Sequence, residues 1–172
     1  MASGPPLIGV VGWKSSGKTT LIERLVTALT SQGLRIATVK HTHHALRAHD
    51  GATDGERHRR AGAVQTAVLS PSRWELGGEL MAEPAPALEE VVQRLGPADL
   101  VLVEGFKRAL IPKIEVRREA TATREPLAPC DPNVIAIAAD HTVEGETVPV
   151  LALDDIAGIA TFVRKAAGLW PR

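Results

Sequence analysis

Residues 12–19 read Gly12-Trp13-Lys14-Ser15-Ser16-Gly17-Lys18-Thr19 and match the pattern G-x-x-x-x-G-K-[ST] without a mismatch. A short apolar run, Leu7–Val11, precedes this stretch, and apolar residues at helical spacing follow it. A strand, a glycine-rich turn and a helix in this order direct successive backbone N–H groups and the positive helix N-terminus at one point. The sequence therefore predicts a P-loop, a backbone cradle for phosphate groups.

The predicted loop assigns roles to its side chains. Lys18 is expected to reach the β and γ phosphates of a nucleoside triphosphate, and it is a candidate catalytic residue. The hydroxyl of Thr19 is placed to coordinate Mg²⁺. The residues predicted to bind the nucleotide are Gly12, Lys14, Ser15, Ser16, Gly17, Lys18, Thr19 and Thr20.

A second strand is predicted to bring a carboxylate to the same site. Residues 99–105 read Asp99-Leu100-Val101-Leu102-Val103-Glu104-Gly105, so Glu104 ends a continuously apolar run. P-loop enzymes more commonly carry Asp at this position. Two roles for Glu104 therefore stay open: a Mg²⁺ ligand that acts through water, or a catalytic residue that orients the nucleophile. Asp99 begins the strand and is expected at the opposite edge of the sheet, in solvent.

A polar segment is the next candidate site. Residues 40–44 read Lys40-His41-Thr42-His43-His44 and follow the predicted strand Arg35–Lys40, at the sheet edge where ligands bind in open α/β folds. Three interpretations are open. Lys40, His41, His43 and His44 contact an anion or substrate, the histidines bind a metal transiently, or the loop is merely solvated.

Residues 54–60 carry the remaining candidates. A helix is expected to begin near Asp54, and the basic run Arg57-His58-Arg59-Arg60 follows. Asp54 is a candidate catalytic residue, because its carboxylate could ligate Mg²⁺ or orient a water molecule. Arg57 is a candidate for anion binding, although basic runs are commonly plain solvated faces.

The order of apolar patterns predicts the fold class. Short β-branched runs alternate with segments of helical period, which is typical of an α/β fold with a mainly parallel sheet and helices on both faces. The predicted strands are Leu7–Val11, Arg35–Lys40, Val64–Leu69, Asp99–Glu104, Lys113–Arg117, Val134–Ala138 and Val148–Leu151. The predicted helices contain Leu21–Leu29, Ala87–Leu95 and Ile156–Val163. Residues 1–172 are expected to form a single P-loop nucleotide-binding domain.

Composition narrows the class of protein further. The 172 residues include 20 basic and 20 acidic side chains, so no net charge attracts nucleic acid or an anionic membrane. The apolar run near the N-terminus is too short for a signal sequence or a membrane span. The single cysteine, Cys130, rules out an intramolecular disulfide and favours a reducing, cytoplasmic setting.

Together the motifs resemble the molybdopterin-guanine dinucleotide biosynthesis protein B (MobB) family. The resemblance covers most of the chain. It rests on residues 12–21, Val39-Lys40-His41-Thr42-His43-His44, Asp54 with Arg57 and the Arg60–Ala63 turn, Arg73-Trp74, and Leu102-Val103-Glu104-Gly105-Phe106-Lys107. The combination of Lys-His-x-His-His with Val-Glu-Gly-Phe-Lys is much more specific than a P-loop alone. Gly55 is a departure, since similar proteins often carry a hydroxyl residue after the aspartate.

The resemblance implies a homodimeric P-loop protein that binds GTP and Mg²⁺ and is at most a slow Mg²⁺-dependent GTPase. Its implied role is to assist the guanylyltransferase that joins GMP to molybdopterin. The histidine segment is then suited to an anionic pterin phosphate, with molybdopterin as a candidate ligand, or to GTP itself. The residues alone do not establish guanine, because the Asn-Lys-x-Asp element is absent and Asp140 is a candidate by position only.

Two other functions stay open. A small-molecule kinase would use the same P-loop with an acceptor pocket and an arginine lid, for which Arg117, Arg118 and Arg124 are candidates. A metallochaperone GTPase would instead pass a metal ion through His41, His43 and His44. Consumption of an added phosphoryl acceptor would favour the kinase, and stoichiometric metal binding by the histidines would favour the metallochaperone.

Overall fold

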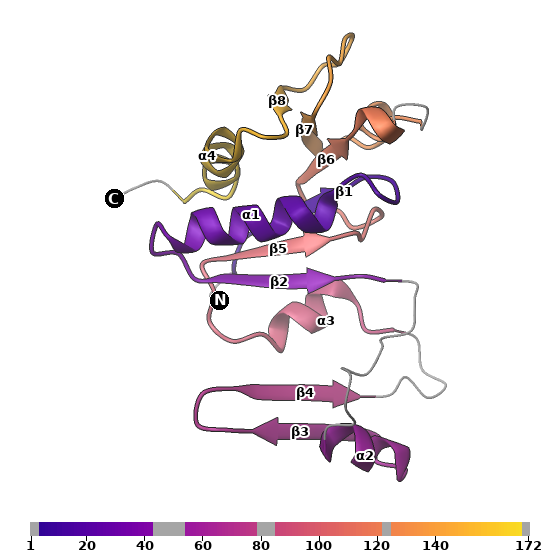
Figure 1. Cartoon of the computed structure of the whole chain (residues 1–172), viewed down its shortest axis with the longest axis vertical. Helices are drawn as coiled ribbons and strands as arrows, with labels where there is room; N and C mark the ends of the chain where they lie inside the picture. Colours follow the sequence, from indigo (N-terminus) through magenta and orange to yellow (C-terminus); the bar gives the residue numbers. More distant parts are fainter. Residues whose placement is uncertain (1–3, 43–53, 79–84, 122–124, 170–172) are drawn as a thin grey trace. The chain divides into compact units, whose positions relative to one another are not determined.

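The computed structural model of the protein describes residues 4–42, 54–78, 85–121 and 125–169 (Figure 1). The chain divides into two compact units. Unit 1 comprises Met1–Thr42 and Leu88–Arg172, and unit 2 comprises His43–Ala87. The predicted phosphate loop and Glu104 both belong to unit 1.

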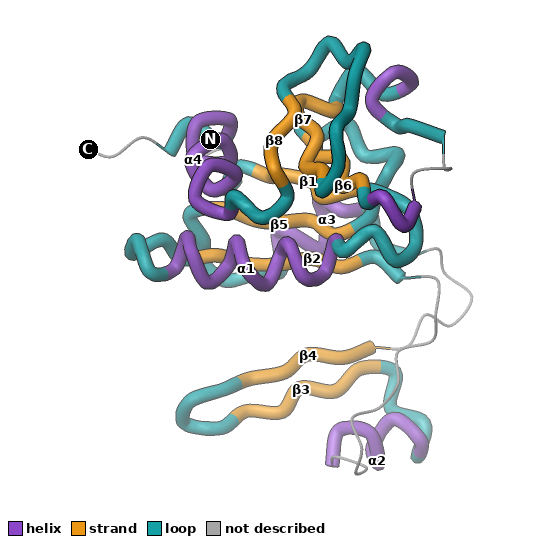
Figure 2. The backbone as a smooth tube through the Cα atoms, turned by 45° about the horizontal axis from the view of Figure 1, so that its top comes forward, coloured by secondary structure: helices purple, strands orange, loops and turns teal. Residues whose placement is uncertain are grey.

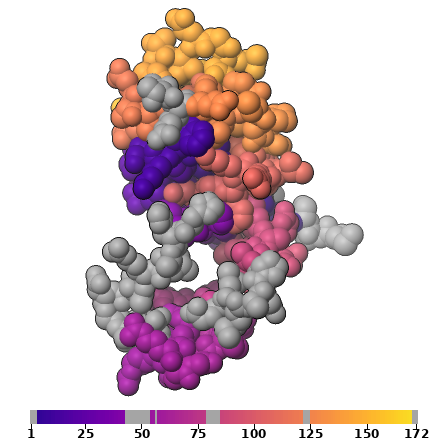
Figure 3. All heavy atoms as spheres, turned by 90° about the vertical axis from the view of Figure 1, so that its right-hand side faces the viewer, coloured from indigo at the N-terminus to yellow at the C-terminus, as the bar shows by residue number. Residues whose placement is uncertain are grey.

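Unit 1 is built around a parallel sheet of six described strands in the order β2-β5-β1-β6-β7-β8. The strands are β1 (Leu7–Val11), β2 (Ile36–Lys40), β5 (Leu100–Glu104), β6 (Lys113–Arg117), β7 (Val134–Ala139) and β8 (Val150–Ala152). The parallel sheet expected from the sequence is confirmed, and the last strand begins two residues later than predicted. Because β1 pairs with both β5 and β6, segments far apart in sequence lie side by side. On the surface seen in Figure 3, indigo atoms from the start of the chain likewise lie next to orange atoms from its later part.

Helices cover both faces of this sheet (Figure 2). They are α1 (Lys18–Thr30), α3 (Leu88–Gln93) and α4 (Ile156–Ala166), with short 3-10 turns η1 (Glu119–Thr121) and η2 (Ala128–Cys130). Alternate residues of β5 enter two separate cores. Leu100 and Leu102 pack with α1 and α4, whereas Val101 and Val103 pack with Leu88 of α3. A strand buried on both faces explains the continuous apolar run in the sequence.

The residues just before α1 and α4 explain where these helices begin. Gly17 precedes α1 in the left-handed conformation, with φ of 89°, so α1 begins at Lys18 inside the phosphate motif. Helix α4 begins after Asp155, whose Oδ1 accepts a hydrogen bond from the Gly158 amide at 2.9 Å. In the described part of the chain, no helix is both long enough and apolar enough to span a bilayer.

Unit 2 contains a short helix and an antiparallel hairpin. Its elements are α2 (Asp54–Arg60), β3 (Gln65–Leu69) and β4 (Trp74–Gly78). The strand predicted at Val64–Leu69 exists, but it pairs only with β4 and is not part of the parallel sheet. Strand β4 was not expected, because Gly77 and Gly78 weaken the strand pattern.

Candidate nucleotide-binding site

The loop between β1 and α1 has the curled backbone that a phosphate cradle requires. Gly12 has φ of 150°, and a Cβ atom there would lie 2.6 Å from both Ser16 Oγ and Val116 O. Gly17 and Ser15 also have positive φ, at 89° and 65°. Only glycine fits at position 12, since even a methyl group would collide with the far wall of the loop.

The centre of this loop holds a buried polar atom without a partner. Ser16 is fully buried, and its Oγ has no hydrogen-bond partner among the described residues. An unsatisfied buried hydroxyl costs about 1–3 kcal/mol, so it marks a position prepared for a polar ligand. A phosphate oxygen meets that need chemically.

Lys18 crosses the loop. Its Nζ donates to the carbonyl oxygen of Trp13 at 2.6 Å. Burial lowers the pKa of Lys18 from its ordinary value; Glu104 opposes this shift, and the charges of Lys107 and Lys40 add to it. The ammonium has three N–H donors and uses one for Trp13 O, so the others could contact a phosphate, and the anion would stabilise the charged form.

Thr19, Glu104 and Lys40 meet at the carboxyl ends of β2 and β5. Thr19 Oγ1 donates to Glu104 Oε1 at 2.8 Å. Lys40 Nζ lies 3.2 Å from Thr19 Oγ1 and 3.2 Å from Glu104 Oε1. Strand pairing explains the meeting, because Lys40 and Glu104 are register partners in β2 and β5. The Thr19–Glu104 pair predicted from sequence is therefore assembled in space.

The donor set suits magnesium. A hydroxyl and a carboxylate are oxygen ligands, and Mg²⁺ commonly binds through one or two protein groups, substrate phosphates and water. Among the described residues, no group of three or more His, Cys, Asp or Glu side chains could hold a metal ion. Thr19 and Glu104 thus fit a Mg²⁺ ion that arrives with a triphosphate, rather than a metal cage made by protein alone.

Trp13 makes two contacts that hold the outer side of the loop in place. Lys107 Nζ lies 3.8 Å from the centre of a Trp13 ring, and Trp13 Nε1 donates to the carbonyl oxygen of Glu125 at 2.7 Å. The first contact is a cation–π interaction. The indole therefore links the P-loop to two segments that follow β5 and β6.

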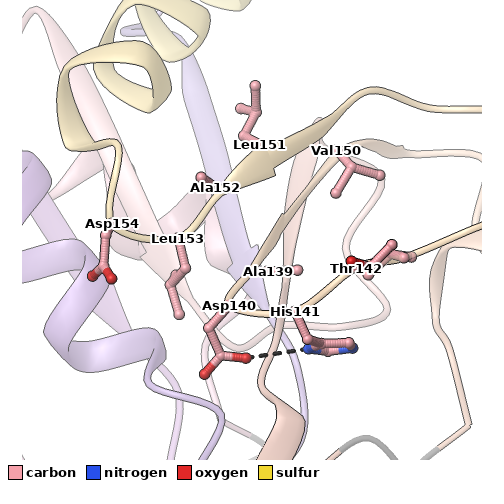
Figure 4. Close-up of a pocket in the computed structure, with 10 residues that line it drawn as sticks. Ala139, Asp140, His141, Thr142, Val150, Leu151, Ala152, Leu153 and Asp154 are labelled. Atoms are coloured by element: carbon pink, nitrogen blue, oxygen red, sulfur yellow. Dashed lines mark hydrogen bonds and ion pairs between the residues drawn. The ribbon is translucent and has the colours of Figure 1, made fainter.

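A pocket of about 560 Å³ lies at the carboxyl ends of β7 and β8 (Figure 4). Its lining includes Asp140, His141, Val150 and Asp154. Figure 4 shows Asp140 paired with His141, while Leu151 points away from them. A smaller recess lined by Gly17, Thr20 and Arg118 shares Leu153 and Asp154 with this pocket. The two hollows therefore lie next to one another, one at the start of α1 and the other at the carboxyl ends of β7 and β8.

The carboxylate of Asp140 is already engaged. Its Oδ1 accepts from the Glu119 amide at 2.7 Å and lies 3.2 Å from His141 Nδ1. Its Oδ2 lies 3.5 Å from Arg118 Nε. Burial alone would raise the pKa of Asp140, but these hydrogen bonds and positive charges outweigh it and lower the pKa.

Arg118, which the sequence indicated only as a lid candidate for the kinase interpretation, lies beside the P-loop. A Cβ on Gly17 would lie 3.6 Å from Arg118 Nε, so the side chain packs over the P-loop glycine. Arg117, its neighbour, is different. Its guanidinium contacts Glu115 at 2.8 Å and Glu146 at 2.6 Å and is 13% exposed. Arg117 cannot act as the lid arginine that the kinase interpretation requires.

The other predicted residues fall in three places. His41 packs its ring on Phe106, with 4.9 Å between ring centres, and its amide donates to Glu104 O at 3.0 Å. His43, His44 and Arg124 lie outside the described residues. Asp54 and Arg57 belong to unit 2, where Arg57 Nη1 lies 3.5 Å from Asp54 Oδ1. Their roles toward a nucleotide stay predictions.

The parallel sheet and the P-loop together define the class of protein. A parallel sheet with helices on both faces and a G-x-x-x-x-G-K-[ST] loop between β1 and α1 defines a P-loop NTPase-like fold. The chain belongs to the MobB family, because the profile of "Molybdopterin guanine dinucleotide synthesis protein B" matches residues 7–140.

Relatives and solved structures agree with this assignment. The molybdopterin-guanine dinucleotide biosynthesis adapter protein of Escherichia coli K12 is 38% identical over 160 residues, covering 92% of this chain and 91% of the relative. The Haemophilus influenzae protein of the same name is 35% identical, covering 93% and 88%. The crystal structure of Bacillus subtilis MobB is 30% identical, with a TM-score of 0.72 and coverage of 94% and 97%.

Proposed function

We propose that this chain is an adapter protein of molybdopterin guanine dinucleotide biosynthesis that binds GTP with Mg²⁺ and assists the guanylyltransferase. Family membership supports the pathway. The observation that carries nucleotide binding is the P-loop with its buried, unpartnered Ser16 hydroxyl, beside the Thr19–Glu104 pair. These features together suit an oligophosphate and a divalent ion.

The phosphate end of the nucleotide is assigned to the loop and the start of α1. Gly12 and Gly17 permit the curl of the loop, and the positive N-terminal end of α1 would face the phosphates. Lys18 would contact the β and γ phosphates, and Thr19 and Glu104 would hold Mg²⁺. The bound metal would neutralise negative charge on the phosphates.

The nucleoside end is assigned to the pocket beyond Arg118. The recess beside Gly17 and Thr20 shares the lining residues Leu153 and Asp154 with the larger pocket. The volume of the larger pocket, about 560 Å³, is in the range for small-ligand sites. Arg118 lines the recess and pairs with Asp140 of the larger pocket, so its guanidinium is suited to contact the α-phosphate side of the nucleotide.

Hydrolysis is proposed to be slow. The side chain of Glu104 is 11% exposed and already accepts from Thr19 and pairs with Lys40. A carboxylate in that position is a poor general base for an attacking water, since it must first lose its partners. Asp54 remains the second candidate for activating water.

Partner contacts are proposed for unit 2. Among the described residues, its hairpin exposes Val68, Leu69, Trp74 and Leu76. Exposed apolar side chains gathered on one short hairpin are typical of protein interaction surfaces. We assign homodimer contact to this hairpin. Contact with molybdopterin stays assigned, as from the sequence, to Lys40, His41, His43, His44 and Arg57.

The test is a reconstituted reaction. Purified protein, guanylyltransferase, molybdopterin and GTP are combined, and the yield of dinucleotide product is compared with and without this chain. The yield is expected to rise, and the two proteins are expected to co-purify. Unchanged yield together with no co-purification would refute the adapter role, while GTP titration calorimetry checks nucleotide binding separately.

A further inference from the structure

The Thr19 hydroxyl has one proton and two lone pairs to share. Its proton goes to Glu104 Oε1 at 2.8 Å, and one lone pair accepts from Lys40 Nζ at 3.2 Å. The same ammonium lies 3.2 Å from Glu104 Oε1. A cation belonging to the protein therefore contacts both oxygen atoms that are candidates for magnesium.

The ammonium and a metal ion exclude one another at this place. The Thr19 hydroxyl keeps a second lone pair, but Mg²⁺ needs its ligand oxygens at about 2.0–2.1 Å, which would place the ion beside the ammonium that already contacts the same two oxygens. Two cations that share the same oxygens also repel, and the 11% exposure of the Glu104 side chain limits screening by water.

Of the groups at this place, Lys40 is the one with room to move. Its side chain is 53% exposed and sits at the last residue of β2, whereas Glu104 is a buried residue of a central strand. A lysine carries its charge on a flexible four-carbon stem and can turn toward a neighbouring anion. The terminal phosphate of a nucleotide held by Lys18 and Thr19 would be such an anion.

We propose that Lys40 is a stand-in cation for the magnesium site. In the metal-free protein its ammonium neutralises Glu104 and donates to the Thr19 hydroxyl, and it leaves when Mg²⁺ arrives with the triphosphate. This inference rests on the proposed nucleotide site and adds a residue to it. It also differs from the sequence interpretation that assigned Lys40 to contact with an anion or substrate.

The experiment compares Lys40→Met, which keeps an unbranched side chain without charge, with Lys165→Met, a matched loss of one exposed lysine on α4. Binding of a fluorescent GTP analogue is followed while Mg²⁺ is titrated. In Lys40→Met the Mg²⁺ midpoint is expected to fall about tenfold, the size of one charge-assisted hydrogen bond. In EDTA the same variant is expected to bind the analogue more weakly, because Glu104 is left as an uncompensated negative charge near the phosphates.

Two other results would overturn the inference, and a third would refute the nucleotide site. A lysine that only contacts phosphate would weaken binding at every Mg²⁺ concentration without lowering the midpoint, and that outcome overturns the inference. A midpoint equal to that of Lys165→Met overturns it as well. Wild-type protein that binds no analogue at any Mg²⁺ concentration would refute the nucleotide site itself. In that case Mn²⁺ titration of the nucleotide-free protein, followed by water-proton relaxation, still decides the inference: tighter Mn²⁺ binding by Lys40→Met supports it, and equal binding overturns it.

Discussion

Strand β5 and the β3–β4 hairpin are both short and rich in apolar residues, yet their surroundings differ. All five residues of β5 are buried, and alternate side chains enter two cores. In the described residues of unit 2, the hairpin buries Thr66 and leaves Val68, Leu69 and Trp74 exposed. The difference indicates that unit 1 is stabilised by its own cores and can hold a rigid site, whereas the hairpin is suited to gain its stability by contact with another surface.

The largest expected effect tests the site in unit 1. Lys18→Ala is predicted to weaken GTP binding by at least about 100-fold, because one ammonium supplies the charged contact to two phosphates while the loop backbone stays formed. Titration calorimetry measures the loss, and Lys165→Ala serves as the control. Wild-type affinity in Lys18→Ala would remove the P-loop from the proposed site.

The next effect concerns the stability of unit 1. Lys113 is 1% exposed, and its Nζ donates to Asp131 Oδ2 at 2.6 Å. Asp131→Asn leaves a buried ammonium without its counter-ion, and we expect a loss of about 3 kcal/mol in the free energy of unfolding. Urea denaturation measures this. Asp154→Asn, whose carboxylate is 91% exposed beside Arg24, is the control and should cost less than about 1 kcal/mol. Equal losses would mean that burial of Lys113 is unimportant.

A hairpin substitution tests the other side of the comparison. Leu69→Ser is expected to change the unfolding free energy of unit 1 by less than about 0.5 kcal/mol, whereas Leu25→Ala in the core should cost about 2–5 kcal/mol. Light scattering should show Leu69→Ser shifting from dimer to monomer. A large loss of stability in Leu69→Ser would instead support the prediction that residues 1–172 fold as one domain.

The smallest effect is a titration. Hydrogen bonds from the Arg35 side chain and amide lower the pKa of Asp99 to about 2. Because this pKa is depressed in the folded protein, the pair contributes stability above the ordinary aspartate range, and the contribution is lost as pH falls toward 2. Carboxyl NMR is expected to show the low midpoint, and Arg35→Ala should return it toward 3.8. An unchanged midpoint in Arg35→Ala would contradict the assigned cause.

Sequence reasoning succeeded where a pattern is local. The P-loop and β5 were predicted because a motif of eight residues and an unbroken apolar run each determine one element. It failed where partners are distant. Arg117 looked suited to a lid, since nothing in the sequence shows that Glu146, 29 residues away, pairs with it. Lys40 reaches Thr19 only because β2 lies beside β5, a pairing that composition does not reveal.

Support for the phosphate loop comes from segments that lie far along the sequence. Gly12 packs under the carbonyl oxygen of Val116, and Trp13 contacts Lys107 and the carbonyl oxygen of Glu125. Because Glu125 follows Trp13 by 112 residues, the loop residues leave the ribosome long before this last contact can form. A nascent chain that stops before Glu125 carries the complete motif but lacks the hydrogen bond from the Trp13 indole to Glu125 O. We therefore expect the outer side of the loop to become fixed late in translation, when the second half of the chain folds against the first.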